Sequence, residues 1–214
     1  MFKSLTAVNH ESDLVDSIIE DIRAKSVECS NVAVINGDNR FWNIKAGYSF
    51  IIDDFKRLAA DTYFAETGRS PKNVVLMINH ISAANTPDGS GGGWHVDSVR
   101  SQYKLFMYLT DCTSIETGPL TLFTSGSVWK DRLVIALNYL RGNKFRFTNE
   151  KIKALEKKGF SEKPFLKKSC HPFFINTSFI HRGAEITSGE RMMLTAYMFD
   201  TELPPSIAMR VKGL

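Results

Sequence analysis

Residues 171–199, HPFFINTSFIHRGAEITSGERMMLTAYMF, contain two apolar stretches of strand length. The first covers 171–177 and the second 191–199, and the loop between them contains Gly183 and Gly189. Apolar runs rich in aromatic and β-branched residues, bounded by glycine-containing loops, are typical of β-strands. The C-terminal part of the chain is therefore predicted to be sheet.

Strand-like segments also occur upstream. Residues 73–82 (NVVLMINHIS) are apolar and β-branched over strand length, and a glycine-rich loop follows at 86–93. The segments 102–110 (QYKLFMYLT) and 119–123 (PLTLF) are separated by a polar turn. We expect these two segments to pair as antiparallel neighbours.

Helical patterns occupy the N-terminal part and interrupt the strands. Apolar residues recur every three or four positions over 11–25, and a second helix is predicted over 51–66. Two more, 128–139 and 149–158, lie between strand-like segments, and Thr148 is placed to cap the second of them. The order of elements predicts an α+β, mainly β chain with helices outside a β-sandwich or jelly roll.

Length and composition favour one domain over 1–214. The chain has 214 residues, of which 43% are hydrophobic and 23% charged, as is ordinary for a soluble globular domain. Residues 1–70 are expected to form a helical N-terminal support, and 74–200 a jelly-roll core. The helical insertion at 128–163 is either a lid over substrate or a layer that only covers the sheet.

Charge and cysteine content exclude several classes of function. The net charge of +4 is spread along the chain, which does not suit binding to nucleic acid. Three widely spaced cysteines are expected to be free thiols in a reducing compartment. The sequence shows no signal peptide at its start and no apolar run of membrane-spanning length, so a cytoplasmic protein is expected.

The segment GGGWHVDS (91–98) places His95 and Asp97 two residues apart. Side chains alternate along an extended chain, so both point to the same side and can reach one ion. His181 follows an apolar stretch, where a strand is expected to end, and it offers a third ligand. Two histidines and one carboxylate are the ligand set of non-haem iron(II) oxygenases, although zinc also accepts them.

Arg191 opens the apolar stretch 191–199, in which Arg191, Met193, Thr195 and Tyr197 share one face. If that face points toward the metal, the guanidinium can form a bidentate pair with a carboxylate. An arginine at a strand start is more often a solvated surface residue. Its spacing from His181 favours the inward orientation.

Three stretches together resemble the signature regions of the phytanoyl-CoA dioxygenase-like family of iron(II)- and 2-oxoglutarate-dependent oxygenases. They are GGGWHVDS, ETGPLTLFTSGS (116–127) and FIHRGAEITSGERMMLTAYMF (179–199), and the likeness covers about 74–199. The resemblance implies a double-stranded β-helix fold, a cupin-like jelly roll. It also implies that His95, Asp97 and His181 bind iron, and that Arg191 holds the distal carboxylate of 2-oxoglutarate.

The sequence departs from the family pattern near the cosubstrate. Related enzymes often have Ser or Thr two residues after the arginine, whereas this chain has Met193. Thr195 is the nearest hydroxyl on the same face. Gln102, followed by Tyr103 and Lys104, offers further candidates for contact with the cosubstrate.

The resemblance implies an enzyme that uses iron(II), 2-oxoglutarate and O2 to hydroxylate an unactivated carbon of a small-molecule substrate, with release of succinate and CO2. Neither nucleic acid nor a membrane is expected as a partner, and a homodimer is compatible with the sequence. One alternative is a cupin-like isomerase or sensor that binds metal without 2-oxoglutarate. Another is a β-sandwich interaction domain without metal.

Overall fold

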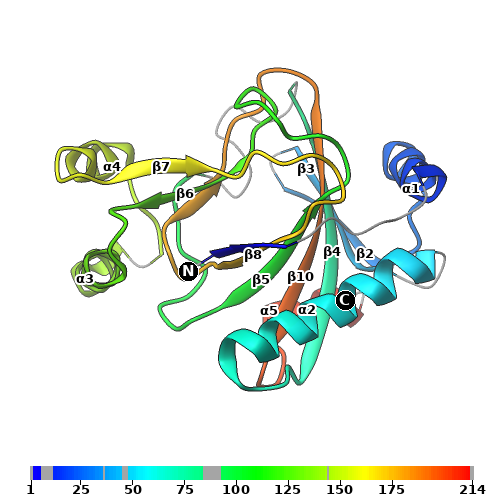
Figure 1. The fold of residues 1–214 in the computed structure, drawn as a ribbon, viewed down its shortest axis with the longest axis horizontal. Coiled ribbons are helices and arrows are strands. Elements are labelled where there is room, and N and C mark those ends of the chain that lie inside the picture. Colours follow the sequence, from blue (N-terminus) through cyan, green and yellow to red (C-terminus); the bar gives the residue numbers. More distant parts are fainter. Residues whose placement is uncertain are drawn as a thin grey trace.

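Two antiparallel sheets form the body of the molecule (Figure 1). The computed structural model describes residues 2–5, 12–35, 37–44, 48–83, 93–143 and 145–212. The larger sheet runs in the order β1 (Phe2–Ser4), β8 (Phe173–Asn176), β5 (Tyr103–Tyr108), β10 (Glu190–Phe199), β4 (Asn73–Ser82), β3 (Asp38–Ile44) and β2 (Cys29–Ile35). The smaller sheet runs in the order β7 (Ser161–Pro164), β6 (Leu120–Thr124) and β9 (His181–Gly183).

Strand β10 shows why the large sheet forms. It pairs with β4 along its whole length, from Glu190 opposite Ser82 to Phe199 opposite Asn73, and with β5 on its other side. Both faces of β10 are buried, which explains its nearly continuous apolar sequence. Its outward residues Met192, Leu194, Ala196 and Met198 join one core cluster, whereas Met193 joins the cluster between the sheets.

Helices α1 (Ser12–Ala24) and α2 (Ser49–Thr67) cover the outer face of the large sheet. Their buried residues, including Ile18 and Ile22 from α1 and Phe55 from α2, belong to the same apolar cluster as the outward residues of β10. Both helices match the predicted ranges 11–25 and 51–66 within two residues. Helix α5 (Pro205–Lys212), which the sequence did not predict, packs beside β2 and β3.

A helical insertion separates β6 from β7. It consists of α3 (Val128–Asn138), a short segment η3 (Tyr139–Asn143) and α4 (Asn149–Glu156), and it forms one end of the molecule (Figure 1). The Thr148 side chain accepts a hydrogen bond from the backbone N–H of Lys151, so its predicted role as the N-cap of α4 is confirmed. The insertion was predicted to be helical to residue 163, but its last residues form β7, an exposed polar strand without an apolar pattern.

The predicted pairing of 102–110 with 119–123 is wrong. The first segment contains β5, which pairs with β10 and β8 in the large sheet, and the second contains most of β6, which pairs with β7 and β9 in the small sheet. The connection between them crosses from one sheet to the other. Tyr108 joins the two sheets, because its hydroxyl accepts from Leu120 N–H and donates to the Phe165 carbonyl.

Residues 1–70 are not only helical, because they also contain β1, β2 and β3. The hairpin of β2 and β3 extends the large sheet beyond β4.

Three other predictions concern single segments. His181 begins a short strand, β9, and does not end one, because β8 stops at Asn176. The predicted glycine-rich loop at 86–93 lies outside the described residues except for Gly93. Among the described helices, none is both long enough and apolar enough to cross a membrane.

Candidate metal centre

Backbone pairing brings the three predicted ligands together. His95 and His181 exchange two backbone hydrogen bonds, of 3.0 Å from His95 N–H and 2.8 Å from His181 N–H. Asp97 N–H donates to the Thr177 carbonyl at 3.0 Å. The H-x-D segment is therefore fixed against the chain that leads from β8 into β9, and all three side chains enter the same space.

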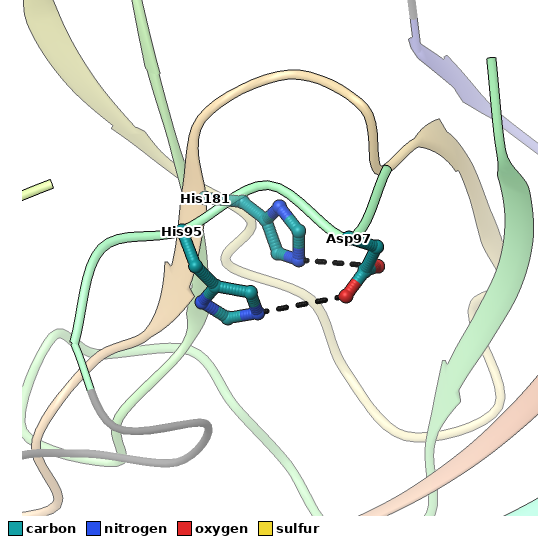
Figure 2. A group of neighbouring side chains, drawn as sticks. All are labelled: His95, Asp97 and His181. Atoms are coloured by element: carbon teal, nitrogen blue, oxygen red, sulfur yellow. Dashed lines mark ion pairs between the residues drawn. The ribbon is translucent and has the colours of Figure 1, made fainter. Parts of the chain in front are cut away.

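Figure 2 shows both imidazoles directed at the Asp97 carboxylate. His95 Nε2 lies 3.6 Å from Asp97 Oδ1, and His181 Nε2 lies 3.6 Å from Asp97 Oδ2. One ligand atom from each residue lies within 4.8 Å of the others, as in a site for one ion. This is the only such group of His, Cys, Asp or Glu among the described residues, and it contains no cysteine.

The orientation of each imidazole is set by a backbone carbonyl. His95 Nδ1 lies 2.9 Å from the Gly93 carbonyl, and His181 Nδ1 lies 2.9 Å from the Phe179 carbonyl. A carbonyl only accepts, so Nδ1 donates in each ring and the neutral ring exposes the lone pair of Nε2. This support of one ring nitrogen is the usual arrangement for metal-binding histidines.

The electrostatics keep both histidines neutral and the aspartate charged. Burial, together with the proximity of the ionisable His181, lowers the pKa of His95 to about 3, and burial also lowers the pKa of His181. Burial alone would raise the pKa of Asp97, but Lys104 and the two histidines outweigh it and hold that pKa below its usual range. Neutral imidazole and carboxylate are the forms that bind a metal ion.

Lys104 is a buried cation in direct contact with this group. Its Nζ lies 2.7 Å from Asp97 Oδ2 and 4.2 Å from the centre of the Tyr197 ring. Burial would lower its pKa, but the Asp97 carboxylate raises it, so the lysine stays charged. The sequence suggested Lys104 only as a contact for the cosubstrate. Its pairing with Asp97 depends on β5 lying opposite the H-x-D segment, which no local pattern shows.

A cavity of about 500 Å³ opens beside the three candidate ligands. Met193, Thr195 and Tyr197 of β10 line it, as their predicted common face requires. The Thr195 hydroxyl is buried without a hydrogen-bond partner among the described residues. Gln102 does not line the cavity; its backbone N–H and carbonyl bond to Asn176 and Thr177.

The β2–β3 hairpin supplies cavity residues that the sequence analysis missed. Ile35, Asp38 and Arg40 line the wall, and Arg40 Nε donates to Asp38 Oδ2 at 2.7 Å. Burial raises the pKa of Asp38, although the charges of Arg40 and Arg191 oppose that shift. The sequence does carry a signal for this hairpin, because the dipeptide Asn-Gly at 36–37, between strand-like segments, is typical of two-residue hairpin turns.

Arg191 is buried without a partner. Only 1% of its surface is exposed, and no nitrogen of its guanidinium has a hydrogen-bond partner among the described residues. The alternation along β10 puts it on the inward face with Met193, Thr195 and Tyr197. Arg191 itself is not among the residues that line the cavity, although Met193 and Thr195 on the same face are. A buried cation without a hydrogen-bond partner is costly.

Comparison with known proteins gives matches only at the level of structure. No family model matches the sequence, and no curated protein matches it. AviO1 from Streptomyces viridochromogenes has a TM-score of 0.58 and 14% identity, covering 95% of this chain and 91% of AviO1. HygX from Streptomyces hygroscopicus, solved with nickel and 2-oxoglutarate, has a TM-score of 0.55 and 15% identity, covering 94% and 83%.

A Pseudomonas putida prolyl-4-hydroxylase has a TM-score of 0.52 and 13% identity, covering 94% of this chain and 93% of the hydroxylase. The fold is a double-stranded β-helix. At these identities the likeness establishes the fold alone. Within this double-stranded β-helix, the candidate ligands lie between the sheets, since His181 belongs to β9 and Lys104, in contact with Asp97, belongs to β5.

Proposed function

We propose that the chain is an iron(II)- and 2-oxoglutarate-dependent dioxygenase. The observation that carries this proposal is the combination of two buried features. One lines the cavity, and the other lies on the same face of β10 as the cavity residues Met193 and Thr195. The first is the group of two neutral histidines and one carboxylate. The second is the Arg191 side chain, which lies on the inward face of β10 and lacks a hydrogen-bond partner among the described residues. A protein that only bound metal would not require the second feature.

The residues fit iron(II). His95 and His181 present Nε2 lone pairs, Asp97 supplies the single negative charge, and no fourth protein ligand closes the group among the described residues. A structural zinc site would more often have four protein ligands. Three ligands leave coordination positions for cosubstrate and O2. Lys104, by engaging Asp97 Oδ2, would hold the carboxylate in place for the metal.

The residues also fit 2-oxoglutarate. Arg191 would bind its distal carboxylate through two charge-assisted hydrogen bonds, which would satisfy the buried guanidinium. The unpartnered Thr195 hydroxyl is placed to donate a further bond. The lining of the cavity favours Thr195 over Gln102 for that contact. Bound iron and 2-oxoglutarate would supply the oxidising power, and the chain would place the substrate and exclude water.

The proposed reaction is hydroxylation of an unactivated carbon in a small molecule, with release of succinate and CO2. Supporting it are the resemblance to the phytanoyl-CoA dioxygenase-like family and the Asp97 ligand, which occupies the position a halide would take in a halogenating relative. HygX, which has the same fold, binds nickel and 2-oxoglutarate. The cavity of about 500 Å³ suits a small-molecule substrate.

Anaerobic calorimetric titration with iron(II) and then with 2-oxoglutarate tests the proposal. We expect one iron(II) per chain, 2-oxoglutarate binding that requires the metal, and succinate once O2 and a pool of small metabolites are added. Metal binding without 2-oxoglutarate binding would favour a cupin-like isomerase or sensor. No metal binding would leave only a β-sandwich interaction domain.

A further inference from the structure

The helical insertion exposes an apolar stripe at the end of the molecule shown at the left of Figure 1. Trp129 is 70% exposed and Leu140 is 79% exposed, and Leu133 and Leu137 between them are each more than 40% exposed. Their spacing of three and four residues puts these four side chains on one face of α3 and its continuation. Contiguous exposed apolar side chains often mark an interaction site, whereas single exposed apolar residues are common on any protein surface.

The buried face of α3 carries polar residues. Asp131 accepts hydrogen bonds from Thr124 and Ser125, and Asn138 Nδ2 donates to the Arg146 carbonyl at 2.9 Å. These bonds fix how the helix is rotated about its axis. The apolar stripe therefore cannot turn inward without leaving buried polar groups unsatisfied.

A groove of about 220 Å³ lies between α3 and α4, next to the stripe. Its apolar residues are Val134, Leu137, Ala154 and Leu155, and its charged residues are Arg141, Lys151 and Lys158. None of its lining residues is acidic. Burial and the neighbouring charge of Arg141 lower the pKa of Lys151, and Lys151 Nζ also donates to Asn138 Oδ1.

We propose that this groove binds an acidic amphipathic helix of a partner protein. Apolar side chains spaced along such a helix would fill the groove between α3 and α4, and its acidic residues would pair with Arg141, Lys151 and Lys158. This inference does not depend on the proposed enzymatic activity.

Charge argues against a second copy of this chain as the occupant of the groove, and shape argues against a lipid bilayer. In a symmetric dimer the same patch meets itself, so cations would face cations. A lipid bilayer would cover the exposed stripe but would not fill a concave groove between two helices. An acidic helix satisfies both the shape and the charge.

The docking site adjoins the candidate metal centre through the chain between η3 and α4. Phe147 N–H donates to the Trp94 carbonyl, and the Phe145 carbonyl accepts from Val96 N–H. Phe145 and Arg146 line the cavity that holds the metal ligands. A partner bound at the groove would thus be close to the segment that lines this cavity.

Selection from a displayed peptide library tests the proposal on the intact protein. The peptides would form helices of about five turns, with leucines fixed at helical spacing and all other positions free to be Glu or Lys. We expect Glu to be enriched over Lys at those positions. Binding of a selected peptide should weaken about tenfold or more in Leu137→Glu and in Lys158→Glu.

Ile115→Glu is the matched control, because Ile115 is also an exposed apolar residue, at 67%, but lies in the connection between β5 and β6. It should bind the peptide as the wild type does. Enrichment of Lys, no enrichment, or equal binding by Leu137→Glu would overturn the proposal. So would binding to phosphatidylserine vesicles that is lost in Leu137→Glu, or a dimer in analytical ultracentrifugation that the same variant dissociates.

Discussion

At the scale of single residues, Arg191 is a cation that the fold buries without a hydrogen-bond partner among the described residues. Asp38 contributes a nearby negative charge. Its Oδ2 accepts from Arg40, and its Oδ1 is buried without a hydrogen-bond partner among the described residues. The guanidinium thus has no carboxylate hydrogen-bonded to it among the described residues. Whether this guanidinium binds an anion can be tested by binding measurements, without any catalytic reaction.

Arg191→Lys should bind 2-oxoglutarate more weakly than the wild type, and Arg191→Ala more weakly still. Lysine keeps the charge but loses the planar fork, whereas alanine loses both, and each charge-assisted bond is worth about 1.5–3 kcal/mol. Calorimetric titration of the iron-loaded variants measures this. Iron affinity should stay unchanged because Arg191 is not a ligand. Equal 2-oxoglutarate affinity in wild type and Arg191→Ala would contradict the assignment.

His95 should make the metal-free protein sensitive to acid. Its pKa in the folded chain is about 3, against an ordinary value of 6.5, so between these values the unfolded chain binds more protons. The free energy of unfolding should therefore fall as the pH is lowered from about 6.5 toward 3. Urea denaturation at several pH values would show a shallower dependence in His95→Gln. An unchanged slope would mean that His95 is not buried and neutral.

At the scale of elements, the crossing from β5 to β6 requires Gly118. Its φ is +68°, and a Cβ there would lie 2.4 Å from Ile186 Cγ1 and 2.8 Å from the Ala184 carbonyl oxygen. Both the backbone conformation and the close approach therefore exclude a side chain.

Gly118→Ala should lower the free energy of unfolding by about 2 kcal/mol or more. Gly126→Ala is the control, because Gly126 has a similar φ of +78° but no atom within 4 Å of the added Cβ. Its cost should be only that of the left-handed backbone, about 1–2 kcal/mol. Denaturant titration of both variants measures the difference. An equal loss would show that the contact with Ile186 relaxes at no cost.

Elements with a strong local pattern were predictable, and those defined by distant partners were not. Strand β4 was predicted over its observed range because ten consecutive residues suit a buried strand. The β2–β3 hairpin was missed because polar residues interrupt both strands, and Val32 and Val34 face solvent. Strand β7 was also missed, because its sequence has no apolar pattern and it is defined only by its pairing with β6.

At the scale of the whole molecule, a metal ion bound between the sheets should stabilise the entire fold. A ligand present at about 100 times its dissociation constant adds about 2.7 kcal/mol to the free energy of unfolding if it binds only the folded state. Nickel(II), in thermal denaturation, should raise the midpoint for wild type, and a chelator should reverse the rise. Asp97→Ala should show no rise, because the only anionic ligand is gone. A full rise in that variant would place the metal elsewhere.

The arrangement of the site was predictable only in part. His95, Asp97 and His181 come together as the sequence predicted, because an H-x-D segment and a later histidine form a recognisable set. Asp38, Arg40 and the pairing of Lys104 with Asp97 depend on which strands are neighbours. That information is distributed over the whole chain. It becomes visible only when the strand order is known.

The backbone bonds between His95 and His181 have a consequence for folding kinetics. These residues are far apart in sequence, so their pairing must close a long loop of chain. Contacts of long sequence separation are expected to form late. Metal should then bind only the finished fold, so it would slow unfolding and leave the rate of folding nearly unchanged. The metal-bound protein would therefore be kinetically stable because it unfolds slowly.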